Sequence, residues 1–146
     1  MKKILVAVDF SQGSIEALRQ AVKLGEAFKA KLLLLHVLHD PADAPGFYAS
    51  KKAGRKVLRN MEEAASSMMS EFVGKHLKNA ENFEVRIVPG LSAEQIVRVA
   101  DKEESDLVVL GTNGHSGLKR LMIGSVTDRV LRACKCPVLA VRSTKS

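Results

Sequence analysis

The sequence predicts an α/β domain in which a parallel sheet is covered by helices on both faces. Short apolar runs alternate with segments whose apolar residues recur every three or four positions. Uninterrupted apolar runs are typical of strands covered on both faces, and the alternating order β-α-β-α-β-α-β-α-β favours a doubly wound parallel sheet. The 146 residues, 46% hydrophobic and 27% charged, show neither an internal repeat nor a linker, so we expect one domain across residues 1–146.

Two buried strands are predicted near the N-terminus, at residues 4–8 and at residues 32–38. A polar turn after Asp9 leads into the helix that connects them. Its apolar face combines spacings of three and four residues and consists of Ile15, Leu18, Ala21, Val22, Leu24, Gly25 and Phe28.

The middle of the chain contains a loop at residues 39–50, rich in Pro and Gly, followed by a long helix. Methionines at helical spacing more often fill a core than line a cofactor groove. We therefore expect an apolar face made of Val57, Met61, Ala65, Met68, Phe72 and His76. Residues 83–87 alternate apolar and charged side chains, which predicts a third strand nearer the edge of the sheet.

The last third begins with Ser92 and Gln95, whose spacing predicts a capping box at the start of a helix. Residues 107–110 are a fourth apolar strand, and Pro137 to Val141 form a fifth. The helix between these strands carries four further apolar positions, namely Val126, Val130, Leu131 and Cys134.

Composition limits the classes of function. The chain has no apolar run long enough to cross a bilayer and no signal-peptide pattern, so we expect a cytoplasmic protein. The formal charge is +7, and nearly all of the excess lies after Thr112, which favours an anionic partner. Nucleic acid is a weaker candidate than a nucleotide, because the chain has one Tyr and no Trp for stacking.

Cys134 and Cys136 form a C-x-C pair, which is compatible with a redox or metal site. Two thiols without nearby His or acidic ligands do not complete a tetrahedral shell, so reduced, structural thiols are the favoured interpretation. His36, His39 and His76 lie on a strand, a loop and a helix, so we expect packing or surface roles for them and no metal site.

The segment after the fourth strand carries the strongest functional signal. Gly111, Gly114 and Gly117 allow backbone amides to approach an anion closely, and Gly124-Ser125 opens the next helix, whose unpaired amides suit phosphate. The segment is neither a Walker A loop nor a dinucleotide fingerprint. It is therefore either a phosphate-binding loop or a permissive connection. Asp9, after the first strand, is expected at the same sheet edge, although it also suits a helix cap.

The spacing Gly111-x2-Gly114-x9-Gly124-Ser125 resembles the ATP-binding signature of the universal stress protein family. The likeness extends over residues 124–132 and 136–142, and residues 3–9 resemble the family's first strand. This resemblance implies a five-stranded parallel sheet of order 3-2-1-4-5. It also implies ATP as ligand and a homodimer formed through the last strand, Pro137 to Val141. Among the residues near the loop, Asp9 is the one candidate contact for Mg²⁺, through water.

Carried over position by position, the resemblance implies a nucleotide site. Ala7 and Asp9 would line the adenine and ribose end, Val37 would bond the adenine edge, and Leu110 and Gly111 would flank the ribose. The phosphates would be held by Thr112, Asn113, Gly114, His115, Gly124, Ser125, Val126 and Thr127. His115 stands where the family often has a basic residue, which weakens one contact.

Two functional readings follow. The leading one is an ATP-binding regulatory protein of stress responses, a nucleotide-dependent switch with slow hydrolysis at most. The alternative is a weak ATPase or nucleotidyl-transfer enzyme on the same scaffold, although efficient phosphoryl transfer needs metal-binding carboxylates that the loop lacks. A receiver-type signalling domain is disfavoured, because a lone Asp9 replaces the paired acids that such a domain needs.

Overall fold

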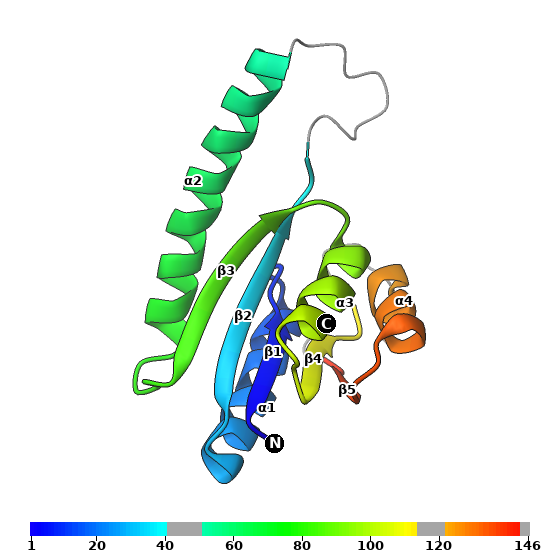
Figure 1. Cartoon of the computed structure of the whole chain (residues 1–146). Helices are drawn as coiled ribbons and strands as arrows, with labels where there is room; N and C mark the ends of the chain where they lie inside the picture. The colour runs from blue at the N-terminus through cyan, green and yellow to red at the C-terminus, as the bar shows by residue number, and fades with distance from the viewer. Residues whose placement is uncertain (41–50, 114–121, 144–146) are drawn as a thin grey trace.

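The computed structural model describes residues 1–40, 51–113 and 122–143. Within them lies a five-stranded sheet of order β3-β2-β1-β4-β5, and all four strand pairs are parallel, as expected (Figure 1). The strands are β1 (Lys3–Ala7), β2 (Lys31–Leu38), β3 (Phe83–Pro89), β4 (Leu107–Gly111) and β5 (Val138–Val141). The strand predicted nearer an edge, β3, is an edge strand.

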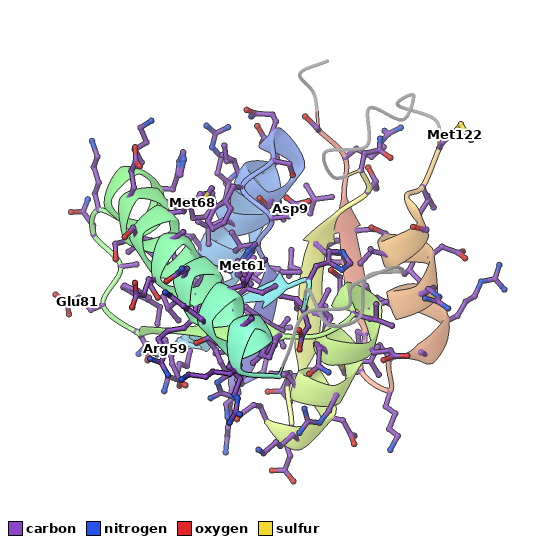
Figure 2. All side chains as sticks on the ribbon, turned by 90° about the horizontal axis from the view of Figure 1, so that it is seen from above. Asp9, Arg59, Met61, Met68, Glu81 and Met122 are labelled. Atoms are coloured by element: carbon purple, nitrogen blue, oxygen red, sulfur yellow. The ribbon has the colours of Figure 1, made fainter. Side chains whose placement is uncertain are left out.

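In the described parts of the chain, four helices cover the two faces of this sheet: α1 (Gln12–Phe28), α2 (Lys51–His76), α3 (Ser92–Lys102) and α4 (Ser125–Ala133). Helices α1 and α2 pack on one face and α3 and α4 on the other, which the view from above makes clear (Figure 2). Each predicted strand and helix is present, with bounds shifted by a few residues at most. Most of the predicted loop, residues 41–50, lies outside the described residues.

The core has two layers, one on each face of the sheet. Ile4 and Val6 of β1 face α1 and α2, whereas Leu5 faces α3 and α4, and all three are fully buried. This alternation is the period of two that a strand imposes, applied to a strand with apolar residues on both faces. In the described ranges, no helix combines the length and apolarity that a membrane span requires.

The predicted apolar face of α2 is wrong at two positions, Val57 and Met68, and Val57 is 42% exposed. Met68 is 50% exposed, whereas Met69 is 2% exposed and packs in the core with Ala65 and Phe72. Successive helical residues lie 100° apart, and the spacing 65–69–72 defines the buried stripe, which leaves Met68 on its solvent side (Figure 2). The core-filling interpretation therefore holds for Met69 and not for Met68. Phe28, the last residue of α1, is also exposed.

The predicted capping box at Ser92 and Gln95 is also wrong. Leu91 is the N-cap of α3 and makes no side-chain capping bond, and Ser92 is already the first helical residue. The tight turn at Gly90, with φ of 137°, brings the Gln95 side chain against Gly90 and sets the start of the helix one residue early.

Helix α4 buries two residues, Thr127 and Val130, of which Val130 is the apolar one. Val130 is fully buried against the α3 side of the sheet, whereas Val126 and Leu131 are exposed and Cys134 follows the last turn. Only one of the three apolar positions predicted within this short helix therefore belongs to the core.

Candidate functional site

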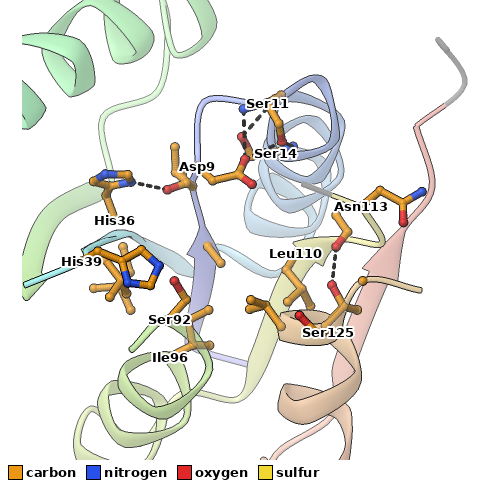
Figure 3. A pocket seen from close by; sticks show the side chains of 18 residues that line it. Asp9, Ser11, Ser14, His36, His39, Ser92, Ile96, Leu110, Asn113 and Ser125 are labelled. Atoms are coloured by element: carbon orange, nitrogen blue, oxygen red, sulfur yellow. Dashed lines mark hydrogen bonds between the residues drawn. The ribbon is translucent and has the colours of Figure 1, made fainter. Parts of the chain in front are cut away.

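A pocket of about 460 Å³ opens at the carboxyl ends of β1, β2 and β4 (Figure 3). Here β1 lies between β2 and β4, so the strand order reverses, which is where open α/β sheets bind ligands. The volume is typical of small-molecule sites. Ten residues predicted for the site line this pocket: Ala7, Asp9, Val37, Leu110, Gly111, Asn113, Gly124, Ser125, Val126 and Thr127.

Three helices begin at the pocket. Ser11 is the N-cap of α1, Ser92 is the first residue of α3, and Gly124 is the N-cap of α4, and each of them lines the pocket. The first-turn amides of a helix have no partner within the helix, and its dipole is positive at that end. Gly124 has no side chain with which to cap the α4 amides. The start of α4 therefore brings partial positive charge and uncapped first-turn amides to the pocket.

The loop between β1 and α1 is held by Asp9. Its Oδ1 accepts a hydrogen bond from the Ser11 amide at 3.0 Å and another from the Ser11 hydroxyl. Ser11 Oγ in turn accepts from the Ser14 amide at 3.2 Å, which caps α1. Asp9 is thus not the helix cap itself. It orients the capping residue while its carboxylate lies at the wall of the pocket (Figure 3).

Phe10 adopts a left-handed backbone, with φ of 66°, between Asp9 and Ser11. A bulky residue takes this conformation only when its surroundings compensate for the strain. Its ring lies 4.6 Å from the His36 ring and 5.7 Å from the Phe72 ring, centroid to centroid. This aromatic contact fixes the turn that places Asp9 at the pocket.

His36 and His39 line the pocket, although the sequence indicated only packing or surface roles for them. His36 Nδ1 lies 2.6 Å from the carbonyl oxygen of Val8. Because a carbonyl oxygen only accepts, Nδ1 carries a hydrogen and donates it. The signal that sequence reasoning passed over is position, since both residues lie at or just beyond the carboxyl end of β2.

Two side chains hold the backbone in place where the chain leaves β4. Thr127 Oγ1 donates a hydrogen bond of 2.7 Å to the Gly111 carbonyl, which ties the first turn of α4 to the strand end. With its amide oriented to donate, Asn113 lies 3.0 Å from the Thr112 carbonyl and also contacts the Met122 carbonyl. The two described segments that flank residues 114–121 are thereby joined.

Three predicted residues are not among those that line the pocket. Thr112 is buried, and its amide already donates to the Val141 carbonyl at 2.9 Å. Its carbonyl accepts from the Gly124 amide at 2.7 Å, so the Gly124 amide is also engaged. Gly114 and His115 lie outside the described residues.

The arrangement suits an anion attached to a flat apolar group. Ala7, Val37, Ile96 and Leu110 supply an apolar wall, and the start of α4 supplies donors for an anion. Asp9 is the one carboxylate among the described residues that line the pocket. No group of three or more His, Cys, Asp or Glu able to hold a metal occurs in the described ranges. A carboxylate oxygen together with ligand phosphates is nevertheless a normal environment for Mg²⁺.

The sequence is similar to a known family of proteins over almost its whole length. The model of the universal stress protein family matches residues 1–142. Universal stress protein MJ0531 of Methanocaldococcus jannaschii is 34% identical over 99% of this chain and 84% of its own length. MJ0577 of the same organism is 33% identical over 99% of this chain and 97% of its own.

Solved structures agree with the architecture. The structure of MJ0577 superposes with a TM-score of 0.82 and 28% identity, covering 99% of this chain and 98% of that one. A universal stress protein solved in complex with cAMP superposes with a TM-score of 0.64 and 26% identity, covering 98% of each chain.

Proposed function

Because the chain belongs to the universal stress protein family, we propose that it binds ATP with Mg²⁺ in the pocket between β1, β2 and β4. In this proposal the protein is a nucleotide-dependent regulatory switch of stress responses, rather than an efficient enzyme. Hydrolysis is slow at most, because Asp9 is the single carboxylate among the described lining residues and phosphoryl transfer normally uses more than one acidic group.

One observation carries the proposal. The uncapped first turn of α4 and the carboxylate of Asp9 line the same pocket as an apolar wall at the reversal of strand order. Amides at a helix N-terminus bind phosphate, an apolar wall accommodates a base, and a carboxylate attracts the cation that accompanies a polyphosphate. The relative solved with cAMP supports an adenine nucleotide as the class of ligand.

Within this proposal the residues divide by the part of ATP that they contact. Ala7, Val37 and Leu110 contact adenine and ribose, and Asp9 contacts the ribose or a water-bound Mg²⁺. The phosphates lie against the first turn of α4, residues 125–127, with Asn113, Gly114 and His115 of the preceding segment. Thr112 acts through the position of its backbone, because its amide is engaged by Val141.

We further propose that the whole chain, residues 1–146, is one cytoplasmic domain that forms a homodimer through its last strand. The structure supports this pairing in one respect: β5 is an edge strand whose four residues are all half-buried. An edge strand with apolar side chains is a template for pairing with a second chain. Sedimentation of the purified protein, with and without ATP, tests the dimer and its dependence on nucleotide.

The decisive experiment is calorimetry with ATP and Mg²⁺ on nucleotide-free protein, together with mass spectrometry of any ligand released from freshly purified protein. We expect binding by the wild type, and an adenine nucleotide among the released compounds. Gly124→Val is expected to abolish both signals, because a branched side chain at this buried position, directly before the first turn of α4, would occupy space in which the proposed phosphates lie. Its backbone, with φ of −64° and ψ of 158°, accepts valine without strain.

Gly74→Ala is the matched control, since Gly74 lies on α2 with nothing within 4 Å of an added Cβ. Its affinity is expected to equal that of the wild type. Titrations with AMP and cAMP separate nucleotide classes: binding of either without binding of ATP contradicts a triphosphate site. Absence of heat and of thermal stabilisation with all three nucleotides overturns the proposal.

A further inference from the structure

The two cysteines lie at the opposite end of α4 from the nucleotide pocket. Cys134 is the C-cap of α4, and Cys136 precedes β5 by two residues. Both side chains are half-buried beside the apolar cluster on the α3 side of the sheet. The chain bends at residues 135–136, and the two Sγ atoms lie 3.4 Å apart, within thiol hydrogen-bond distance.

A hollow of about 300 Å³ gives access to this thiol pair. It is lined by both cysteines, by residues of α3 and by the turn that follows α3. Arg98 and Lys135 supply its cations, Asp101 and Glu104 its acids, and Lys135 pairs with Asp101 at 3.5 Å. The hydroxyl of Ser105, on the same wall, is buried and has no hydrogen-bond partner within the described part of the chain. A polar, accessible wall of this kind suits a small hydrophilic reagent.

We propose that Cys134 and Cys136 are a redox modification site at which a small disulfide, such as oxidised glutathione, converts the dithiol into an intramolecular disulfide. The sulfur atoms need to approach by only about 1.4 Å to reach disulfide length. A ring closed over one intervening residue is strained, and strained disulfides are easily reduced. The pair is therefore suited to a reversible bond rather than to a permanent structural one.

The two cysteines differ in their readiness to react. Burial, reinforced by the hydrogen bond with Cys134, raises the pKa of Cys136 to about 11. At neutral pH the thiolate fraction of Cys136 is therefore far smaller than that of an ordinary cysteine, and only thiolates attack disulfides. Cys134 is accordingly the first nucleophile.

The reaction is a double thiol–disulfide exchange. The Cys134 thiolate attacks one sulfur of oxidised glutathione, the glutathione S–S bond breaks, and one glutathione leaves as a thiolate. Cys136 then loses its proton to solvent and attacks the Cys134 sulfur of the mixed disulfide, which releases the second glutathione thiolate. Two protein thiols are oxidised while one glutathione disulfide is reduced to two thiols.

The bond would alter the connection between α4 and β5. The Cys134 amide donates to the Val130 carbonyl at 2.9 Å, so the sulfur that moves belongs to the residue closing the last turn of α4. Oxidation thus adds a covalent restraint between the helix whose first turn lines the nucleotide pocket and the strand at the sheet edge.

Intact-mass spectrometry tests this proposal without any nucleotide. Reduced protein is incubated with oxidised glutathione, quenched with acid and alkylated with N-ethylmaleimide. The wild type is expected to lose about 2 Da and take up no maleimide, and dithiothreitol is expected to restore two maleimide adducts. Full alkylation after the incubation, an accumulated glutathione adduct or a disulfide-linked dimer would each overturn the proposal.

Single substitutions assign the two roles. Cys136→Ser is expected to stop at a glutathione adduct on Cys134, because the resolving thiol is missing. Cys134→Ser is expected to react much more slowly, because Cys136 stays protonated. Faster adduct formation in Cys134→Ser than in Cys136→Ser overturns the assignment of the first nucleophile. Since the wild-type measurement stands alone, it remains decisive even if a variant folds poorly, and its outcome is independent of ATP binding.

Discussion

Gly13 and Gly111 meet backbone to backbone where the start of α1 crosses the exit of β4. A Cβ added at Gly111 would lie 2.9 Å from the carbonyl carbon of Gly13, and one added at Gly13 would lie 2.5 Å from the Asn113 carbonyl oxygen. These neighbours are main-chain atoms and cannot rotate away as a side chain can. The start of α1 and the end of β4 can therefore approach this closely only because neither position carries a side chain.

Gly111→Ala is expected to lower the free energy of unfolding by about 1–3 kcal/mol, because the new methyl group forces two backbones apart. Chemical denaturation measures this change. Gly74→Ala, at an open helical position, is the control and is expected to raise stability by roughly 0.5–1 kcal/mol. Equal stabilities of the two variants would refute the close-approach explanation.

Asp9→Asn is expected to separate the structural role of Asp9 from its binding role. An asparagine oxygen still accepts from the Ser11 amide, so we expect stability to fall by less than about 1 kcal/mol. Affinity for ATP with Mg²⁺ is expected to fall about tenfold, since the charge that attracts the cation is gone. Calorimetry beside thermal unfolding distinguishes the two effects, and an unchanged affinity would remove Asp9 from the site.

Ser11→Ala and Ser92→Ala form a matched pair at two helix starts. Ser11 caps α1 through its bond with the Ser14 amide, so its loss is expected to cost about 0.5–2 kcal/mol of unfolding free energy. Ser92 makes no such bond, because Leu91 is the N-cap of α3, and its loss is expected to cost under about 0.5 kcal/mol. Equal costs by urea denaturation would contradict the assigned caps.

A network of ion pairs around Arg86 predicts how the free energy of unfolding depends on pH in the acid range. Arg86 bonds Glu103 at 2.5 Å and Glu84 at 2.6 Å, while Lys3 and Lys31 reach the same two carboxylates at 3.2 and 3.1 Å. Hydrogen bonds, first from Arg86 and then from the lysines, hold the pKa of both carboxyls below the ordinary value of 4.5. The stability they contribute is therefore complete above pH 4.5 and is lost as the pH falls through the lowered pKa values.

We expect the wild type to lose stability as the pH falls below about 4.5, towards the lowered pKa values, and Glu103→Gln to show a flatter dependence there. At neutral pH the variant is expected to be less stable by about 1 kcal/mol, as is usual for partly exposed pairs. Urea denaturation at several pH values provides the measurement. A variant whose curve runs parallel to that of the wild type would show that Glu103 makes no contribution.

The sequence predicted the fold more completely than the site. Uninterrupted apolar runs such as residues 4–8 leave little choice but a strand covered on both faces, and alternation with helices implies parallel pairing. The position of Met68 could not be predicted in the same way, because Met68 and Met69 are both apolar and only the packing of α2 decides which one is buried.

The site could be predicted where residues follow a strand directly. Asp9 follows β1 and Gly111 ends β4, and the pocket brings both together with Gly124 at the start of α4. Ser92 and Ile96 reach the same pocket from α3, whose placement depends on how the helix crosses the sheet. His36 was missed because a histidine inside an apolar strand indicates only burial, until the neighbouring carbonyl and aromatic ring are known.

The central place of β1 has a consequence for synthesis. Ile4 pairs with Leu32 on one side but with Leu107 on the other, so one hydrogen-bonding edge of the first strand is unpaired until the fourth strand has been made. A nascent chain that has left the ribosome with only β1 to β3 therefore presents an open, apolar edge. Ribosome-associated chaperones would be most needed for this intermediate, before β4 has been synthesised and has paired with β1.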